Sequence, residues 1–166
     1  MTSVTREALI VADASPVIGL AKIGRLDIFE HLACEVLMPR EVWHEVVESG
    51  GERPEVALLA ARFCGSVRDP DPTLVAQFRL LVDAGEAAAL ALATTNPGCL
   101  ILLDDGAGRA VAHGRSIRCI GTAGLLLRAK KAGLIVSLGA DLAALRRHGF
   151  FLHDALVKKL MTAAGE

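Results

Sequence analysis

The sequence predicts an α/β protein in which helices pack on a short, buried parallel sheet. Short apolar runs that suit strands alternate with helical patterns along the chain. The chain is 52% hydrophobic but only 4% aromatic and has no tyrosine, so its core must be aliphatic, which suits a parallel sheet. Its 166 residues suffice for one core, and neither a repeat nor a long linker divides them. We therefore expect a single domain over 1–166.

Strands are expected where a short apolar run is bounded by turn residues or carboxylates. These runs lie at 8–13, 34–39, 99–104 and 117–121. Helices are expected where helical patterns lie between start and stop signals. They cover 14–24, 39–51, 54–65, 73–85, 86–98, 106–116, 122–133, 138–149 and 153–165.

Individual residues fix several of these boundaries. Ser15 is expected to cap the first helix, with Pro16 at its first helical position. Pro39 begins the helix after the second strand, and the glycines that follow end it. Gly85 is expected to separate a pair of helices in the middle of the chain. The segment VRDPDP, at 67–72, is expected to be a turn-rich break.

Composition also limits the environment of the protein. The four cysteines have no C-x-x-C spacing, so zinc is not expected, and they are interpreted as small buried residues in a reducing compartment. The amino terminus lacks a basic segment followed by a long apolar stretch. No apolar run reaches about 18 residues, the length that suggests a membrane span. A soluble, cytoplasmic protein without membrane contact is therefore expected.

The net charge of −1 hides an uneven distribution of charged residues. Residues 1–83 carry 8 basic and 13 acidic side chains, whereas residues 106–165 carry 10 basic and 2 acidic ones. Such a basic excess is typical of nucleic-acid-binding surfaces. It is equally compatible with solvated helix faces, so charge alone leaves both interpretations open.

Two of the predicted strands end in aspartate. Asp13 ends the first, and Asp104 and Asp105 end the third. Ligands of open parallel sheets bind outside the carboxyl ends of the strands, so these side chains are expected to converge. Converging carboxylates repel one another unless a cation binds between them, and oxygen ligands favour Mg²⁺ or Mn²⁺. Alternatively, Asp13 begins a turn before the helix, and one member of the aspartate pair caps the helix that follows.

Two glutamates on predicted helices are further candidates, each with a structural alternative. Glu45 shares an i, i+4, i+7 row with Glu41 and Glu48, for which a solvated acidic face is the default. Glu86 follows Asp83 with the spacing of a capping box, which by itself favours a structural role. The chain has no histidine pattern for a metal, no P-loop and no G-x-S-x-G motif.

Five segments of the chain form a recognisable set: IVADASPVIGLAKIG, LMPREVWHEV, DAGEAAALALA, LILLDDGAGRAVA and CIGTAGLLLRAKKAGLI. In this order they resemble the PIN-domain proteins, and in particular a prokaryotic branch similar to the toxin ribonucleases of type II toxin–antitoxin pairs. The resemblance spans roughly residues 8–165. It implies a three-layer α/β/α domain with a short central parallel sheet, and the closing helical patterns add a helical carboxyl terminus.

The resemblance further implies a ribonuclease that depends on Mg²⁺ or Mn²⁺. The acidic residues of the family fall on four positions, which would be catalytic: Asp13, Glu45, Glu86 and Asp105. These four, with Asp104 as an additional ligand, would hold the metal. On this basis Glu86 is interpreted as a site residue rather than only a cap.

Contacts with partners also follow from the resemblance and from the basic region. The residues expected to contact RNA are Ser15, Arg109, Arg115 and Arg118. Besides RNA, the resemblance implies a small antitoxin protein and a second copy of the chain as partners. Arg109 could instead pair with Asp105 in an i, i+4 salt bridge.

Two other classes of function remain open. The first is a PIN-like module that binds RNA or a partner without cutting, because Leu103 replaces the usual threonine and Glu86 is longer than the common aspartate. The second is a haloacid-dehalogenase-type phosphatase, since DASPV has its strand-end aspartate. Such phosphatases need a second aspartate two residues later, where this chain has Ser15.

Overall fold

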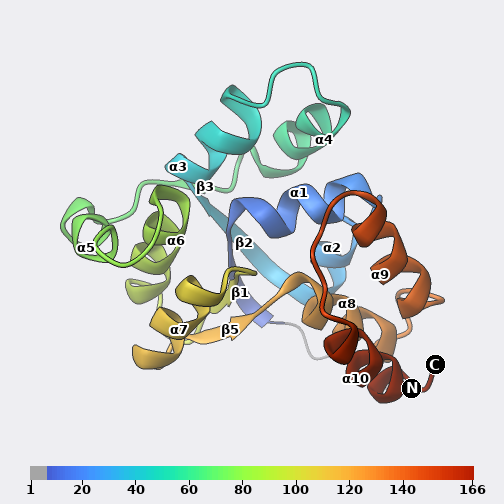
Figure 1. Ribbon diagram of the computed structural model, residues 1–166. Coiled ribbons are helices and arrows are strands. Elements are labelled where there is room, and N and C mark those ends of the chain that lie inside the picture. Colours follow the sequence, from blue (N-terminus) through green and yellow to red (C-terminus); the bar gives the residue numbers. More distant parts are fainter. Residues whose placement is uncertain (1–6) are drawn as a thin grey trace.

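The computed structural model describes residues 7–166, with a five-stranded sheet at the centre (Figure 1). All strand pairs are parallel, in the order β3-β2-β1-β4-β5. The strands are β1 (Glu7–Ala12), β2 (Ala33–Pro39), β3 (Val67–Arg68), β4 (Leu100–Leu102) and β5 (Arg118–Ile120). Four of them lie where the sequence predicts a strand. The two-residue β3 falls in the segment predicted to be a turn, because it is formed by pairing with the end of β2.

Both faces of the sheet are buried, as the continuous apolar strands suggest. In β1, Ile10 and Ala12 contribute to one hydrophobic core and Val11 to another. The same alternation holds in β4, where Leu102 belongs to the first core and Ile101 to the second. The sheet therefore separates two cores, which confirms the predicted three-layer α/β/α fold.

Helices cover each face of the sheet, and the two groups lie on opposite sides of it in Figure 1. The first face packs against α1 (Ala14–Lys22), α2 (Ile28–Leu32), α4 (Pro54–Phe63), α8 (Thr122–Lys131), α9 (Leu138–Arg147) and α10 (Asp154–Ala164). The second face packs against α5 (Pro72–Phe78), α6 (Ala84–Thr94) and α7 (Gly106–Gly114). The carboxyl terminus is helical, as predicted.

Helix boundaries differ from the predictions at three places. Asp13, not Ser15, occupies the N-cap of α1. The short α2 was not predicted, because five residues are too few to show a helical period. Gly85 lies inside α6 rather than between two helices, because the preceding helix, α5, already ends at Phe78. The reason is that Asp83, the N-cap residue directly before α6, forms a capping box with Glu86 and so fixes the start of the helix.

Two expectations drawn from composition can be compared with the structure. Cys99 is buried, but Cys64 is exposed and Cys119 is half-buried, so the expectation of four buried cysteines is wrong for Cys64. The side chain of Cys34 lies outside the described part of the chain. Within residues 7–166, no helix combines the length and the apolar character that a membrane span requires.

Candidate metal and nucleic-acid site

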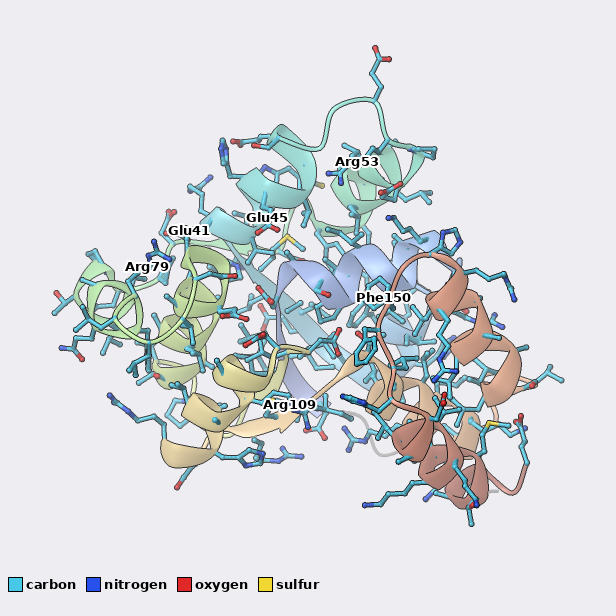
Figure 2. The ribbon with its side chains drawn as sticks, viewed as in Figure 1. Glu41, Glu45, Arg53, Arg79, Arg109 and Phe150 are labelled. Atoms are coloured by element: carbon cyan, nitrogen blue, oxygen red, sulfur yellow. The ribbon has the colours of Figure 1, made fainter. Side chains whose placement is uncertain are left out.

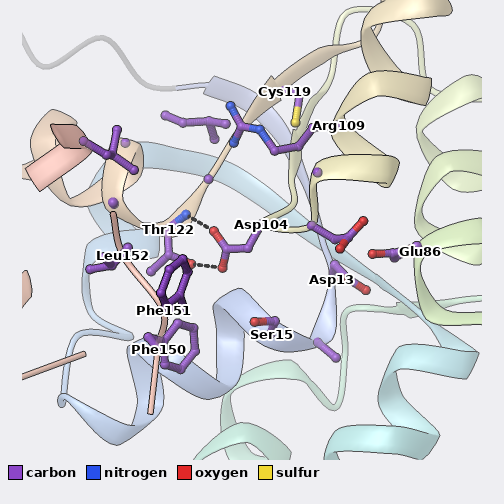
Figure 3. Close-up of a pocket in the computed structure, with 18 of the residues that line it drawn as sticks. Asp13, Ser15, Glu86, Asp104, Arg109, Cys119, Thr122, Phe150, Phe151 and Leu152 are labelled. Carbon is purple, nitrogen blue, oxygen red and sulfur yellow. Dashed lines mark hydrogen bonds between the residues drawn. The ribbon is translucent and has the colours of Figure 1, made fainter. Parts of the chain in front are cut away.

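The carboxyl ends of β1, β4 and β5 open onto a pocket of about 1030 Å³ (Figure 3). From β1 the chain proceeds outward to β2 on one side, while β4 lies on the other side. The gap between β1 and β4 is therefore the topological switch point of the sheet, where open α/β sheets bind their ligands. Six carboxylates line this pocket: Asp13, Glu45, Asp83, Glu86, Asp104 and Asp105.

Asp13 lies at the end of β1 and is only 7% exposed. Its backbone N–H donates to the carbonyl of Leu102 at 3.2 Å, which holds the residue beside the end of β4. Burial raises the pKa of the Asp13 carboxyl to about 7, and the nearby charges of Glu86 and Asp83 add to the effect. Within the described chain, no cationic side chain lies in salt-bridge range of it. Such a carboxyl is stabilised by a proton or by a cation.

The amino end of α6 contributes two carboxylates through a capping box. The Asp83 side chain accepts from the Glu86 N–H at 2.9 Å, and the Glu86 side chain accepts from the Asp83 N–H at 3.2 Å. Burial raises the pKa of Glu86 to about 7, and the charges of Asp83 and Asp105 contribute. The box predicted from the spacing is present, yet both of its carboxylates line the pocket. The capping role and the pocket position of Glu86 are thus compatible.

The two adjacent aspartates after β4 have different partners. Asp105 caps α7, accepting from two backbone N–H groups of its first turn at 2.7 and 3.1 Å. Asp104 instead accepts from the backbone N–H of Thr122 at 2.7 Å and from its hydroxyl at 2.6 Å (Figure 3). Asp104 therefore ties the end of β4 to the start of α8. Asp105 is the member of the pair whose charge acts on Glu86.

Glu45 reaches the pocket from a π-helical turn. The helix after β2 begins as α3 (Arg40–Trp43) and continues as η1 (His44–Glu48), and such π turns are frequent at functional sites. The predicted common face of the glutamates is not kept, since Glu48 pairs with His44 at 2.6 Å while Glu45 lines the pocket. Burial, and then the charge of Asp83, raise the pKa of Glu45.

Gly85 leaves open the space between two of these carboxylates. A Cβ atom at this position would lie 3.3 Å from Oδ1 of Asp13 and 3.3 Å from Oε2 of Glu45. Any larger residue would place its side chain where these two groups face each other. The absence of a side chain at Gly85 therefore keeps this region of the pocket accessible.

Four helices begin at the pocket, and their amino ends offset some of the carboxylate repulsion. Residues at or next to the starts of α1, α6, α7 and α8 all line it. The amino end of a helix carries a partial positive charge and free N–H groups, both of which stabilise carboxylates. This arrangement helps to explain how the fold tolerates six carboxylates around one pocket.

A sequence model described as a PIN domain matches residues 9–166 of this chain. The chain belongs to the PIN-domain family. PIN domains are generally nucleases and typically use divalent metals. A search among curated proteins finds no match to the chain.

The donors of this PIN domain suit a hydrated cation rather than a cage of side chains. Within residues 7–166, no three histidine, cysteine, aspartate or glutamate side chains are arranged to bind one ion. The five carboxylates expected to hold the metal thus do not converge on one point. Mg²⁺ is, however, usually bound through one or two carboxylates and keeps several waters. Asp13, with Glu45 and Glu86 near it, offers the oxygen donors for that mode, while both oxygens of Asp104 already accept from Thr122.

The residues expected to contact RNA are only partly brought together. Ser15 and Arg109 line the pocket, and Arg109 donates to the carbonyl of Leu103 at 3.3 Å. Arg115 instead follows the carboxyl end of α7, and its guanidinium lies 5.1 Å from the ring centre of Phe78. Arg118 lies at the amino end of β5, where it donates to Glu7 at 2.9 Å. Arg115 and Arg118 are therefore remote from this pocket.

Several pocket residues were not predicted from the sequence. Asp83 was assigned only to the capping box, and Thr122 follows β5 in a segment too short to indicate a contact. The connection from α9 to α10 supplies an aromatic wall that includes Phe150 and Phe151. Figure 2 shows Glu45, Arg109 and Phe150, from three distant regions of the chain, around the same open edge of the sheet. The pair of adjacent phenylalanines was the available signal for this wall.

Proposed function

We propose that this protein is a metal-dependent ribonuclease that hydrolyses phosphodiester bonds. The observation that carries the proposal is Asp13, a carboxylate buried at the switch point among other carboxylates, with no cation of the described chain paired to it. A divalent cation is the ligand that would relieve this arrangement. Membership of a family of nucleases supports the same conclusion.

The roles of the residues follow from their positions. Asp13, Glu45 and Glu86 would hold the cation with waters, and Asp105 would bind through one of those waters or directly. When bound, the metal would lower the pKa of a water and offset charge on the scissile phosphate. The capping bonds of Glu86 and Asp105 fix these carboxylates in place, and the bonds from Thr122 do so for Asp104. The guanidinium of Arg109 would bind a phosphate oxygen.

RNA is the proposed substrate because the pocket has both an acidic and a cationic side. A cluster of carboxylates alone would repel a polyanion, so a cation must lie beside it, and Arg109 lines the same pocket. A phosphatase of the haloacid-dehalogenase type is disfavoured by Ser15, which stands where its second aspartate is required. Turnover of a phosphomonoester with none of RNA would favour that alternative.

The decisive experiment combines cleavage with metal binding. Wild type is expected to cut single-stranded RNA with Mn²⁺ or Mg²⁺, and Asp13→Asn to be slower by roughly 100-fold. Calorimetry should show a matching loss of Mn²⁺ affinity in Asp13→Asn. Asp27→Asn is the matched control, because Asp27 is exposed and its side chain makes no capping bond. Equal Mn²⁺ binding by wild type and Asp13→Asn would disprove the site, and RNA binding without turnover would indicate a non-catalytic module.

The toxin role is a finer element of the same proposal, supported by the resemblance to toxin ribonucleases. Induced expression of wild type should arrest bacterial growth, and expression of Asp13→Asn should not. Coexpression of the product of an adjacent small reading frame should restore growth and yield a complex. Growth unaffected by an active wild-type enzyme would contradict the toxin role while leaving the nuclease in place.

A further inference from the structure

The segment over 148–153, between α9 and α10, forms the wall of the pocket across from the carboxylates. In Figure 3, Phe150 and Phe151 lie on the opposite side of the pocket from Asp13 and Glu86. Phe151 is 80% exposed, whereas the phenylalanines outside this segment are fully buried. Phe151 therefore belongs to neither hydrophobic core, and it lies in the wall of the candidate site.

The chain on both sides of Phe151 is held in place. The ring of Phe150 fills the space above Gly19 of α1, where a Cβ atom would collide with it. The carbonyl of Leu152 accepts a hydrogen bond from Arg146, which also pairs with Asp154 at 2.6 Å. Phe151 is thus presented to solvent by an anchored segment.

The ring of Phe151 also has a defined orientation. It contacts His153 edge-to-face, with ring centres 4.6 Å apart and planes at 81°. Edge-to-face pairs are a favourable geometry for aromatic rings. Because Phe151 is 80% exposed, much of its ring surface stays free despite this contact. A flat, oriented and accessible ring is the element on which nucleobases stack in single-strand-binding proteins.

We infer that Phe151, supported by His153, is a stacking platform for an unpaired base of the RNA strand whose phosphate lies at the carboxylates. The inference rests on the proposed function and assigns it a preference for single-stranded substrate. Charge supports a nucleic-acid occupant, because residues 146–159 carry four lysine and arginine side chains and one aspartate. Arg109 lines the pocket itself, while Arg146, Arg147, Lys158 and Lys159 lie on α9 and α10, the helices that flank the 148–153 segment.

The test measures binding of a cleavage-resistant, fully 2′-O-methylated single-stranded RNA in Mg²⁺. Phe151→Ala is expected to weaken binding about tenfold, and Phe151→Trp to retain it, because stacking tolerates any aromatic ring. An RNA lacking the base at the stacked position should bind wild type and Phe151→Ala equally, whereas removal of other bases should preserve the tenfold difference. The quenching of 2-aminopurine at the stacked position should disappear in Phe151→Ala. Leu80→Ala is the control, since Leu80 is 85% exposed and lies outside the pocket.

Each alternative outcome has a distinct meaning. Equal binding of intact RNA by wild type and Phe151→Ala, with wild-type cleavage preserved, overturns the platform and leaves the nuclease. Equal losses for single-stranded and duplex RNA also overturn it, because paired bases are not free to stack. A change of sedimentation behaviour in Phe151→Ala with unchanged RNA binding would instead identify an interface between copies. A wild type that binds Mn²⁺ but neither binds nor cuts RNA would refute the proposed function and the platform together.

Discussion

Neutralising Asp13 should stabilise the metal-free protein at alkaline pH. Burial raises the pKa of this carboxyl from 3.8 to about 7, so the folded protein retains a proton that the unfolded chain releases at lower pH. A raised carboxyl pKa makes stability fall as pH rises, starting near the unfolded pKa of about 4 and ending above the folded pKa of about 7. The amide of Asp13→Asn does not ionise, so this variant should lack that decrease.

The size of the effect follows from the two pKa values. Each pKa unit corresponds to about 1.4 kcal/mol, so ionised Asp13 costs the fold about 4 kcal/mol at pH 8. At about pH 5 the carboxyl is ionised in the unfolded chain but not in the folded protein, and wild type has already lost about 1.5 kcal/mol of those roughly 4 kcal/mol of stability. The stability advantage of Asp13→Asn should therefore grow by about 2.5 kcal/mol between pH 5 and pH 8.

Urea denaturation in EDTA at a series of pH values measures this difference directly. Asp27→Asn should show no such growth, because Asp27 is exposed. Added Mn²⁺ should stabilise wild type more than Asp13→Asn, since only wild type keeps the buried carboxylate. A stability difference that stays flat with pH, or a loss of more than about 1 kcal/mol in Asp13→Asn at pH 8, would refute the reasoning.

Three further predictions concern single contacts. In urea titrations Asp105→Ala should lose about 1 kcal/mol of stability, whereas Asp105→Asn should lose much less because asparagine also caps helices. In calorimetry both variants should bind Mn²⁺ more weakly than wild type. Gly85→Ala should melt no lower than wild type, because alanine favours helices. It should nevertheless bind Mn²⁺ about tenfold more weakly, because the added methyl fills the gap between the carboxylates of Asp13 and Glu45. An unchanged Mn²⁺ affinity would contradict this prediction. Lys130 and the N–H groups at the start of α9 lower the pKa of Glu166 to about 2. In acid melts wild type should therefore lose the stability that ionised Glu166 supplies from about pH 4.5 downward. Glu166→Gln, which has no carboxylate at this position, should not show that loss.

The fold was largely predictable because its signals are local. Strands such as β1 and β4 are apolar on both faces, and most helices are long enough to show start and stop residues. The exceptions depend on distant regions of the chain. The edge strand β3 exists because Met38 and Pro39 of β2 offer it a partner. No property of Val67 and Arg68 alone distinguishes them from a turn.

The site was predictable at the strand ends and less so on the helices. Sheet topology alone brings Asp13 together with the aspartates after β4, so that feature followed from the sequence. Glu45 lines the pocket from η1, where the α-helical period is interrupted, and spacing does not reveal such an interruption. Arg109 lies inside α7 and Arg115 directly follows its last residue, and their different surroundings became clear only from what each contacts.

Capping and metal binding draw on the same residue types, which is why spacing alone could not separate them. A helix N-terminus favours an aspartate or glutamate, and a strand-to-helix connection in a parallel sheet places that N-terminus at the ligand-binding edge. Asp105 and Glu86 show the result, since each accepts backbone hydrogen bonds at a helix start and also faces the pocket. The capping hydrogen bonds hold the carboxylate in one orientation, so a cation would not have to order this side chain on binding. Substitutions that keep the cap but remove the charge are therefore the ones that separate stability from function at these two positions.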